Sequence, residues 1–276
     1  MDSSKDYSKL CIHTITTKPW SLAEAVDNYA MAGVKGITVW QNSVPDKNFE
    51  AAGKLIRSHG LEIISYCRGG FFTEPDAEKR AHAIEDNKKM IAEAAALGAP
   101  ILVLVCGSSP TQSMEDSRTQ IKEGIEALLP IAENAGVKLA IEPLHPMYAD
   151  NRSAINTLGQ ANDMAEYFNS KWVGVAVDVY HLWWDPDLEK EIARCGGNDN
   201  LLAYHICDWK IPTTDLLLDR GLMGEGCIPL QKIKNWVASA GFDGYHEVEI
   251  FSNHYWQMDQ GAFLKKIMEA YDEHCL

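Results

Sequence analysis

Short apolar segments alternate with longer amphipathic segments along the whole chain, and this alternation limits the folds that it can adopt. Eight runs are rich in apolar and β-branched residues, and a stretch with helical spacing follows each of them. The runs are Leu10–Thr14, Gly36–Trp40, Leu61–Cys67, Pro100–Cys106, Val137–Glu142, Val173–Asp178, Leu201–Cys207 and Gly244–Ile250. Strands that alternate with helices predict a parallel sheet, because each helix returns the chain to the same edge.

The number of these units predicts a closed barrel. With 276 residues, the chain is close to the roughly 250 residues of a typical eightfold α/β barrel. No seam divides the units into two halves, and no Gly-x-Gly-x-x-Gly motif follows the first run, which argues against an open dinucleotide-binding sheet. Ser21 followed by Glu24 predicts a capped helix start. We therefore predict an α/β fold, a single (β/α)8 TIM barrel, with one domain over residues 1–276.

Charge and cysteine content limit the partners and the compartment. Lys and Arg total 25 against 39 Asp and Glu, which gives a net charge of −14. An acidic surface repels nucleic-acid phosphates, so we expect no nucleic-acid partner. No run of about 18 apolar residues occurs, and the N-terminus lacks a basic-then-apolar pattern, so we expect no membrane partner. The seven cysteines are scattered without C-x-x-C spacing, which favours a reducing, cytoplasmic location.

Ionisable residues lie at the ends of the last four apolar runs, where barrel enzymes carry their chemistry. They are Glu142, Asp178, His205 and Glu249. Three carboxylates at one barrel mouth repel one another strongly, so a cation is needed among them. Mostly oxygen ligands favour one divalent metal ion, for which we expect Mn²⁺, with Mg²⁺, Co²⁺ or Zn²⁺ as alternatives. Glu247 is the alternative to Glu249, because residues two apart on a strand face the same side.

These motifs resemble those of the xylose-isomerase-like TIM-barrel family of sugar phosphate isomerases and epimerases. The resemblance spans the chain and rests on Ile141-Glu142-Pro143-Leu144, Asp178 with His181, His205 and the segment Gly244–Glu249. The family includes tagatose 3-epimerases, hydroxypyruvate isomerases and inosose dehydratases. It implies a metal-dependent enzyme that removes a proton beside a sugar carbonyl through an enediolate, with Glu142 and Glu249 as acid and base.

After Glu142 the chain departs from the usual epimerase pattern, since His145 and Pro146 stand where those enzymes continue with asparagine. His145 is a candidate catalytic base, because histidine titrates near neutral pH. This feature is similar to the catalytic subunits of C-glycoside deglycosidases. The alternative function is therefore a metal-dependent lyase or dehydratase that acts on 3-oxo-glycosides or keto-polyols. A non-catalytic sugar-binding barrel is a further alternative, and the acidic charge argues against the family's abasic-site endonucleases.

Five residues are expected to contact a small-molecule sugar or glycoside substrate. The resemblance implies this role for His181, three residues after Asp178, and for Arg220 in the loop after the seventh strand. Trp40, Arg68 and His13 lie near strand ends, with ordinary packing as the alternative for each. The absence of a phosphate-binding glycine cluster favours an unphosphorylated substrate. The choice among isomerase, epimerase and lyase, the metal, and assembly as a homo-oligomer or a hetero-subunit stay open.

Overall fold

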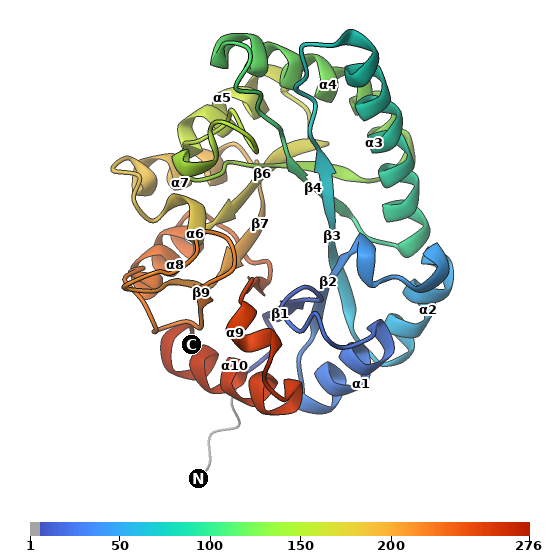
Figure 1. Cartoon of the computed structure of the whole chain (residues 1–276). Coiled ribbons are helices and arrows are strands. Elements are labelled where there is room, and N and C mark those ends of the chain that lie inside the picture. The colour runs from blue at the N-terminus through green and yellow to red at the C-terminus, as the bar shows by residue number, and fades with distance from the viewer. Residues whose placement is uncertain (1–5) are drawn as a thin grey trace.

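A computed structural model describes residues 6–276 and shows a closed barrel of parallel strands surrounded by helices (Figure 1). The barrel strands are β1 (Leu10–His13), β2 (Gly36–Trp40), β3 (Glu62–Gly70), β4 (Ile101–Val105), β5 (Lys138–Glu142), β6 (Val173–Asp178), β7 (Leu201–Ile206) and β10 (His246–Val248). Their hydrogen-bonded order is β1-β10-β7-β6-β5-β4-β3-β2, and β1 also pairs with β2. The predicted (β/α)8 fold is confirmed.

At least one helix follows each barrel strand. The α-helices are α1 (Leu22–Ala32), α2 (Phe49–Ser58), α3 (Ala77–Leu97), α4 (Met114–Ala135), α5 (Leu158–Phe168), α6 (Val179–Leu182), α7 (Leu188–Gly197), α8 (Leu230–Ser239), α9 (Asn253–Trp256) and α10 (Gln260–His274). Short 3-10 helices cover Gln41–Ser43, Pro45–Lys47 and Pro146–Tyr148. The predicted capping box of α1 is present, because Ser21 accepts from the Glu24 backbone and Glu24 accepts from that of Ser21.

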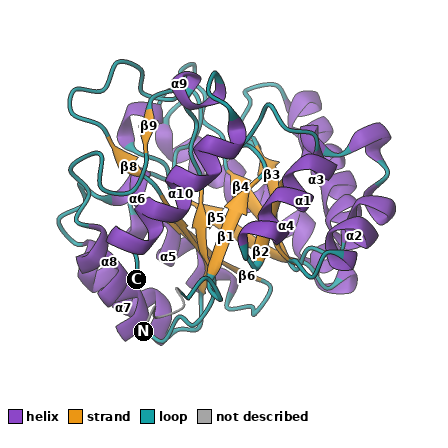
Figure 2. Ribbon diagram, turned by 90° about the horizontal axis from the view of Figure 1, so that it is seen from below, coloured by secondary structure: helices purple, strands orange, loops and turns teal. Residues whose placement is uncertain are grey.

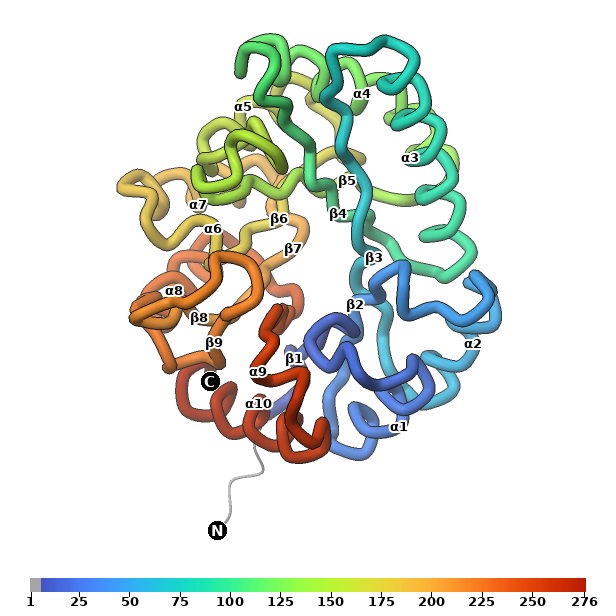
Figure 3. Tube along the Cα trace, viewed as in Figure 1, coloured from blue at the N-terminus to red at the C-terminus, as the bar shows by residue number. Residues whose placement is uncertain are grey.

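Two apolar layers hold the barrel together. The larger layer joins the outer faces of the strands to the helices, as with Leu139 and Ile141 of β5. A smaller cluster includes Val103 of β4, Ala140 of β5 and Ala176 of β6. Since side chains alternate along a strand, this second cluster fills the barrel interior. Figure 3 follows the chain around the barrel. The barrel is closed by the pairing of β10 with β1.

A small antiparallel ribbon stands apart from the barrel sheet. It consists of β8 (Asp208–Trp209) and β9 (Arg220–Gly221). Figure 2 shows this ribbon and α9 at the same end of the barrel. The Asp208 carboxylate accepts hydrogen bonds from the backbone N–H groups of Gly224 at 3.0 Å and Gly226 at 2.9 Å. These bonds order the connection that carries Arg220.

None of the helices between residues 6 and 276 combines the length and apolarity that crossing a bilayer requires.

Candidate metal centre and substrate cavity

The predicted metal ligands lie on the interior face of the barrel, above its small apolar residues. Ala140, Ala176 and Ala203 pack together inside the barrel, and Glu142, Asp178 and His205 each follow one of them by two residues. The period of two along a strand therefore directs all three polar side chains inward. Glu249 follows β10, and its backbone N–H donates to the Ile206 carbonyl at 3.1 Å, which continues the barrel register.

The structure brings the four predicted ligands together. One donor atom from each of Glu142, Asp178, His205 and Glu249 lies within 4.8 Å of the others, and all four residues are buried. They come from β5, β6, β7 and the end of β10, which are neighbours in the barrel. Three carboxylates and one imidazole at this spacing could hold a divalent metal ion.

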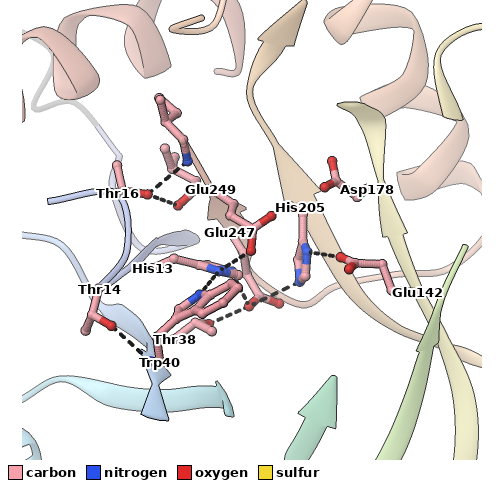
Figure 4. A network of polar contacts seen from close by, with 12 residues as sticks. His13, Thr14, Thr16, Thr38, Trp40, Glu142, Asp178, His205, Glu247 and Glu249 are labelled. Carbon is pink, nitrogen blue, oxygen red and sulfur yellow. Dashed lines mark hydrogen bonds and ion pairs between the residues drawn. The ribbon is translucent and has the colours of Figure 1, made fainter. Parts of the chain in front are cut away.

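The hydrogen bonding of His205 fits a metal ligand. Its Nδ1 lies 3.0 Å from Glu142 Oε1, while Nε2 is buried without a hydrogen-bond partner and lies 3.8 Å from Glu247 Oε2 (Figure 4). Burial lowers the pKa of His205, but the hydrogen bond to Glu142 and the charge of Glu247 outweigh it and raise the pKa to about 9. A divalent ion would supply the positive charge that a proton on His205 otherwise supplies. With its proton on Nε2, the neutral ring would leave Nδ1 free for the ion.

Arg220 is buried and joins two of the carboxylates. Its Nη1 donates to Asp178 Oδ2 at 3.0 Å and to Glu249 Oε2 at 2.9 Å. Burial raises the pKa of Asp178 to about 6, although the Arg220 charge opposes this. Burial also raises the pKa of Glu249, but the charges of His13 and Arg220 outweigh it, so the net pKa is below its usual range. Glu249 is therefore ionised at neutral pH.

His181 presents an unpaired proton donor beside this pair. Arg220 Nη2 lies 3.1 Å from His181 Nε2, and because a guanidinium only donates, Nε2 is the acceptor. The proton of the neutral ring is therefore on Nδ1, which is buried and has no partner among the described residues. Burial and then the Arg220 charge hold the pKa of His181 well below its ordinary value. His181 stays a neutral hydrogen-bond donor.

A second polar layer lies deeper in the barrel. Glu247 Oε2 accepts from Thr38 Oγ1 at 2.5 Å and lies 3.3 Å from His13 Nε2 (Figure 4). His13 Nδ1 lies 3.0 Å from Glu249 Oε1 and 3.2 Å from the indole nitrogen of Trp40. Glu247, the sequence alternative to Glu249, thus contacts His13, which in turn contacts Glu249. The structure places His13 beneath the candidate ligands, within hydrogen-bonding reach of Glu249.

A cavity of about 490 Å³, measured with its open mouth, lies over the candidate ligands. Its wall includes the candidate ligands Glu142 and Glu249. It also includes four of the predicted substrate contacts, namely Trp40, Arg68, His181 and Arg220. The predicted contacts other than His13 are thus brought to one wall.

Two further wall residues, Arg152 and Phe251, were not among those expected from the sequence. Phe251 follows Glu249 by two residues, so the period of the strand could have indicated it. Arg152 lies in the loop before α5, where no periodic pattern indicates the direction of a side chain.

The structure separates His145 from this group. His145 is not among the described residues that line the cavity. Its ring packs against Trp184 and Trp209, with centroid separations of 5.6 and 5.2 Å, and Nδ1 accepts the Met147 N–H. Burial lowers the pKa of His145.

Comparison with protein families identifies the class. A family model described as "Xylose isomerase-like TIM barrel" matches residues 26–268. The chain therefore belongs to this family.

Curated relatives of the chain include an isomerase and an epimerase. It is 26% identical over 204 residues to an inosose isomerase from Bacillus licheniformis, covering 72% of this chain and 71% of that protein. It is 24% identical over 200 residues to the L-ribulose-5-phosphate 3-epimerase UlaE from Salmonella paratyphi A, covering 70% of this chain and 66% of the epimerase. The latter match spans slightly less than two thirds of the relative. The chain thus has a barrel of sugar isomerase and epimerase type.

Solved structures show the same fold. The protein SMc04130 from Sinorhizobium meliloti 1021 is 46% identical, with a TM-score of 0.94 over 98% of this chain and 99% of that one. The IOLI protein, whose structure has a bound zinc atom, is 21% identical, with a TM-score of 0.81 over 97% of this chain and 100% of that one.

Proposed function

We propose that the protein is a divalent-metal-dependent sugar isomerase or epimerase that moves a proton beside a carbonyl group. The observation that carries this proposal is the set of four donor atoms within 4.8 Å of one another, two of which belong to the cavity-wall residues Glu142 and Glu249. The isomerase and epimerase relatives support the type of reaction. The zinc atom in the IOLI structure supports a metal ion in a barrel of this kind. The substrate is a small sugar or glycoside.

The metal ligands in this proposal are Glu142, Asp178, His205 and Glu249. Such a centre supplies Lewis acidity to a carbonyl and its neighbouring hydroxyl, which acidifies the adjacent C–H bond. The three carboxylates favour Mn²⁺, with Mg²⁺, Co²⁺ and Zn²⁺ as alternatives. The cluster lies at the strand ends, where family barrels carry their active sites.

Glu142 and Glu249 are the proposed proton acceptor and donor. Both line the cavity, and in the barrel order β6 and β7 separate the strands that carry them. They therefore approach a bound substrate from different sides, as epimerisation requires. Because Glu249 is ionised, it can accept a proton from carbon, and the other carboxyl group can return one.

His181 and Arg220 are the proposed positioning groups. The unpartnered Nδ1–H of His181 is available to a substrate oxygen, and Arg220 Nε is also buried without a partner. The Nη1 bonds from Arg220 hold Asp178 and Glu249 in place. Trp40, on the cavity wall, offers an aromatic face to sugar C–H groups.

The lyase alternative shares the first proton transfer but relies on His145 as a further base. His145 packs against Trp184 and Trp209 and is not among the described residues of the cavity wall, so it is not placed to act as that additional base. The geometry thus favours isomerisation or epimerisation.

Proton NMR of sugars incubated with the enzyme in D2O tests the proposal. Free ketoses, sugar acids, sugar phosphates and 3-oxo-glycosides would be incubated with Mn²⁺-loaded protein, and the paramagnetic ion would be removed on a chelating resin before recording. We expect deuterium to enter the carbon beside the carbonyl while an isomer or epimer accumulates. Glu249→Gln should abolish the exchange, because an amide cannot accept the proton.

The control variant is Glu78→Gln, which removes an exposed carboxylate at the start of α3 and should exchange at the wild-type rate. Release of an aglycone or of water without an isomer would support the lyase instead. No exchange with any sugar of the panel would contradict the proposal.

A further inference from the structure

Two arginines on the cavity wall form no ion pair within the described chain. Arg68 and Arg152 both line the cavity, yet neither forms an ion pair within 4.0 Å with any carboxylate of the described chain. The Nη1 atom of Arg68 is buried and has no hydrogen-bond partner. A buried charged donor without a partner is unfavourable. The wall therefore holds a binding capacity that the protein itself leaves unused.

The backbone around both arginines is fixed to the end of β4. After Arg68, the Phe71 N–H donates to the Val105 carbonyl at 2.8 Å. The Arg152 carbonyl accepts the Gly107 N–H, also at 2.8 Å. The guanidinium groups additionally lie over aromatic rings, at 4.5 Å from the Phe71 centroid for Arg68 and at 5.3 Å from the Tyr148 centroid for Arg152. The pair is thus formed before any ligand arrives.

The acidic residues of the cavity are already engaged elsewhere. Glu142 contacts His205, and Glu249 contacts Arg220 and His13. Under the proposed function both carboxylates also bind the metal ion, whose charge offsets theirs. Burial and then repulsion by the Arg152 charge lower the pKa of Arg68, and the charges of Glu142 and Glu249 offset this only in part. A ligand anion would relieve this repulsion.

We infer, on the basis of the proposed function, that the substrate carries an anionic group, a carboxylate or a phosphate, which binds to Arg68 and Arg152 while its carbonyl end meets Glu142 and Glu249. Guanidinium groups bind both kinds of oxyanion through paired hydrogen bonds. The substrate class is therefore a sugar acid or a sugar phosphate. A glycine-rich loop is unnecessary for such a subsite, because side chains form it instead of backbone N–H groups.

Calorimetric titration with three matched polyols tests this subsite without relying on turnover. The probes are D-glucitol, which is neutral, D-gluconate, which carries a carboxylate, and D-glucitol 6-phosphate, each titrated into Mn²⁺-loaded protein. At least one anionic polyol should bind about tenfold or more tightly than glucitol. The anion that gains affinity distinguishes a sugar acid from a sugar phosphate.

Arg68→Met and Arg152→Met should each reduce this preference to about twofold or less, with metal content unchanged, because only the charge-assisted bonds are lost. Arg80→Met, a control at the start of α3, should retain the preference. Anionic polyols that bind no tighter than glucitol, or that keep their advantage in both variants, would overturn the inference. These outcomes differ from a failure of the proposed function. That failure would appear as absent metal or absent C–H exchange, while the preference for anionic polyols persists.

Discussion

At the scale of single residues, Arg220 contacts two carboxylates that a bound cation would also contact. Its guanidinium neutralises part of the charge of Asp178 and Glu249, both of which are buried. Without Arg220 these carboxylates would repel each other and lose their hydrogen bonds. The stability of the protein should therefore depend on Arg220 most strongly when no metal ion is present.

Arg220→Met is predicted to lower the free energy of unfolding by about 3–5 kcal/mol in EDTA, as expected for a broken buried ion pair. In Mn²⁺ the loss should be smaller, because the ion supplies positive charge to the same carboxylates. Urea unfolding under the two conditions measures both values, with the exposed Lys265→Met as the surface control. An equal loss with and without Mn²⁺ would argue against a metal ion between Asp178 and Glu249.

His246 in β10 is not a candidate metal ligand, but it makes the free energy of unfolding depend on pH. Burial, together with the charges of Lys234 and Lys9, lowers its pKa from an ordinary value of 6.5 to about 4. Between these two values the unfolded chain binds a proton that the folded chain does not, so stability falls as the pH falls through this window. Above the window the contribution is fully present.

From pH 7.5 to pH 5, this histidine should remove about 2 kcal/mol from the free energy of unfolding. His246→Asn, which offers a polar group to Tyr271 in place of His246 Nδ1, should lose less stability over the same interval. Urea unfolding of both proteins at the two pH values gives the difference. If the two proteins lose the same amount, His246 is not the group responsible.

The strand period could indicate residues that lie on strands, but not those that lie in loops, for which only the family resemblance indicated Arg220. Glu142 and Asp178 end apolar runs, so the strand period alone predicts that they face inward. The same period could not decide between Glu247 and Glu249, since both face the interior, and the structure separates them by depth. Arg152 escaped prediction because a hydrogen bond from Gly107, distant along the chain, fixes its loop.

At the scale of elements, close helix packing constrains one glycine and leaves another free. A Cβ atom on Gly53 in α2 would lie 2.2 Å from the carbonyl oxygen of Leu97 at the end of α3. A Cβ atom on Gly197, the last residue of α7, would have no neighbour within 4 Å. The two positions form a matched pair for the same substitution.

Gly53→Ala is predicted to destabilise the protein by about 1–3 kcal/mol, because α2 and α3 must move apart. Gly197→Ala should be neutral or stabilising by less than about 1 kcal/mol, since alanine favours the helical conformation. The urea midpoint of each variant relative to wild type measures the effect. Similar midpoints for the two variants would show that α2 and α3 are not in the close contact described.

The boundaries of elements were predictable where the chain repeats a period. The sixth run, Val173–Asp178, coincides with β6, whereas the expected final strand Gly244–Ile250 is shortened to His246–Val248. The ribbon of β8 and β9 was not predicted, because two-residue strands show no period. Hydrogen bonds from distant backbone groups to Asp208 stabilise that connection instead.

At the scale of the whole molecule, the alternation of strands and helices was sufficient to predict the barrel. Its closure depends on the pairing of β1 with β10, which lie at opposite ends of the chain. The candidate ligands come from four neighbouring strands of the closed barrel. A metal ion would therefore join consecutive segments of the second half of the chain and should stabilise the folded state.

Metal content is the measurement that tests the central claim most directly. Each protein would be stripped with a chelator, dialysed against Mn²⁺ and then analysed by mass spectrometry for bound metal. The account predicts one Mn²⁺ per wild-type chain, a marked loss in Glu142→Gln and in Asp178→Asn, and full retention in the surface control Glu78→Gln. Undiminished metal in both ligand variants would contradict the assignment of this centre.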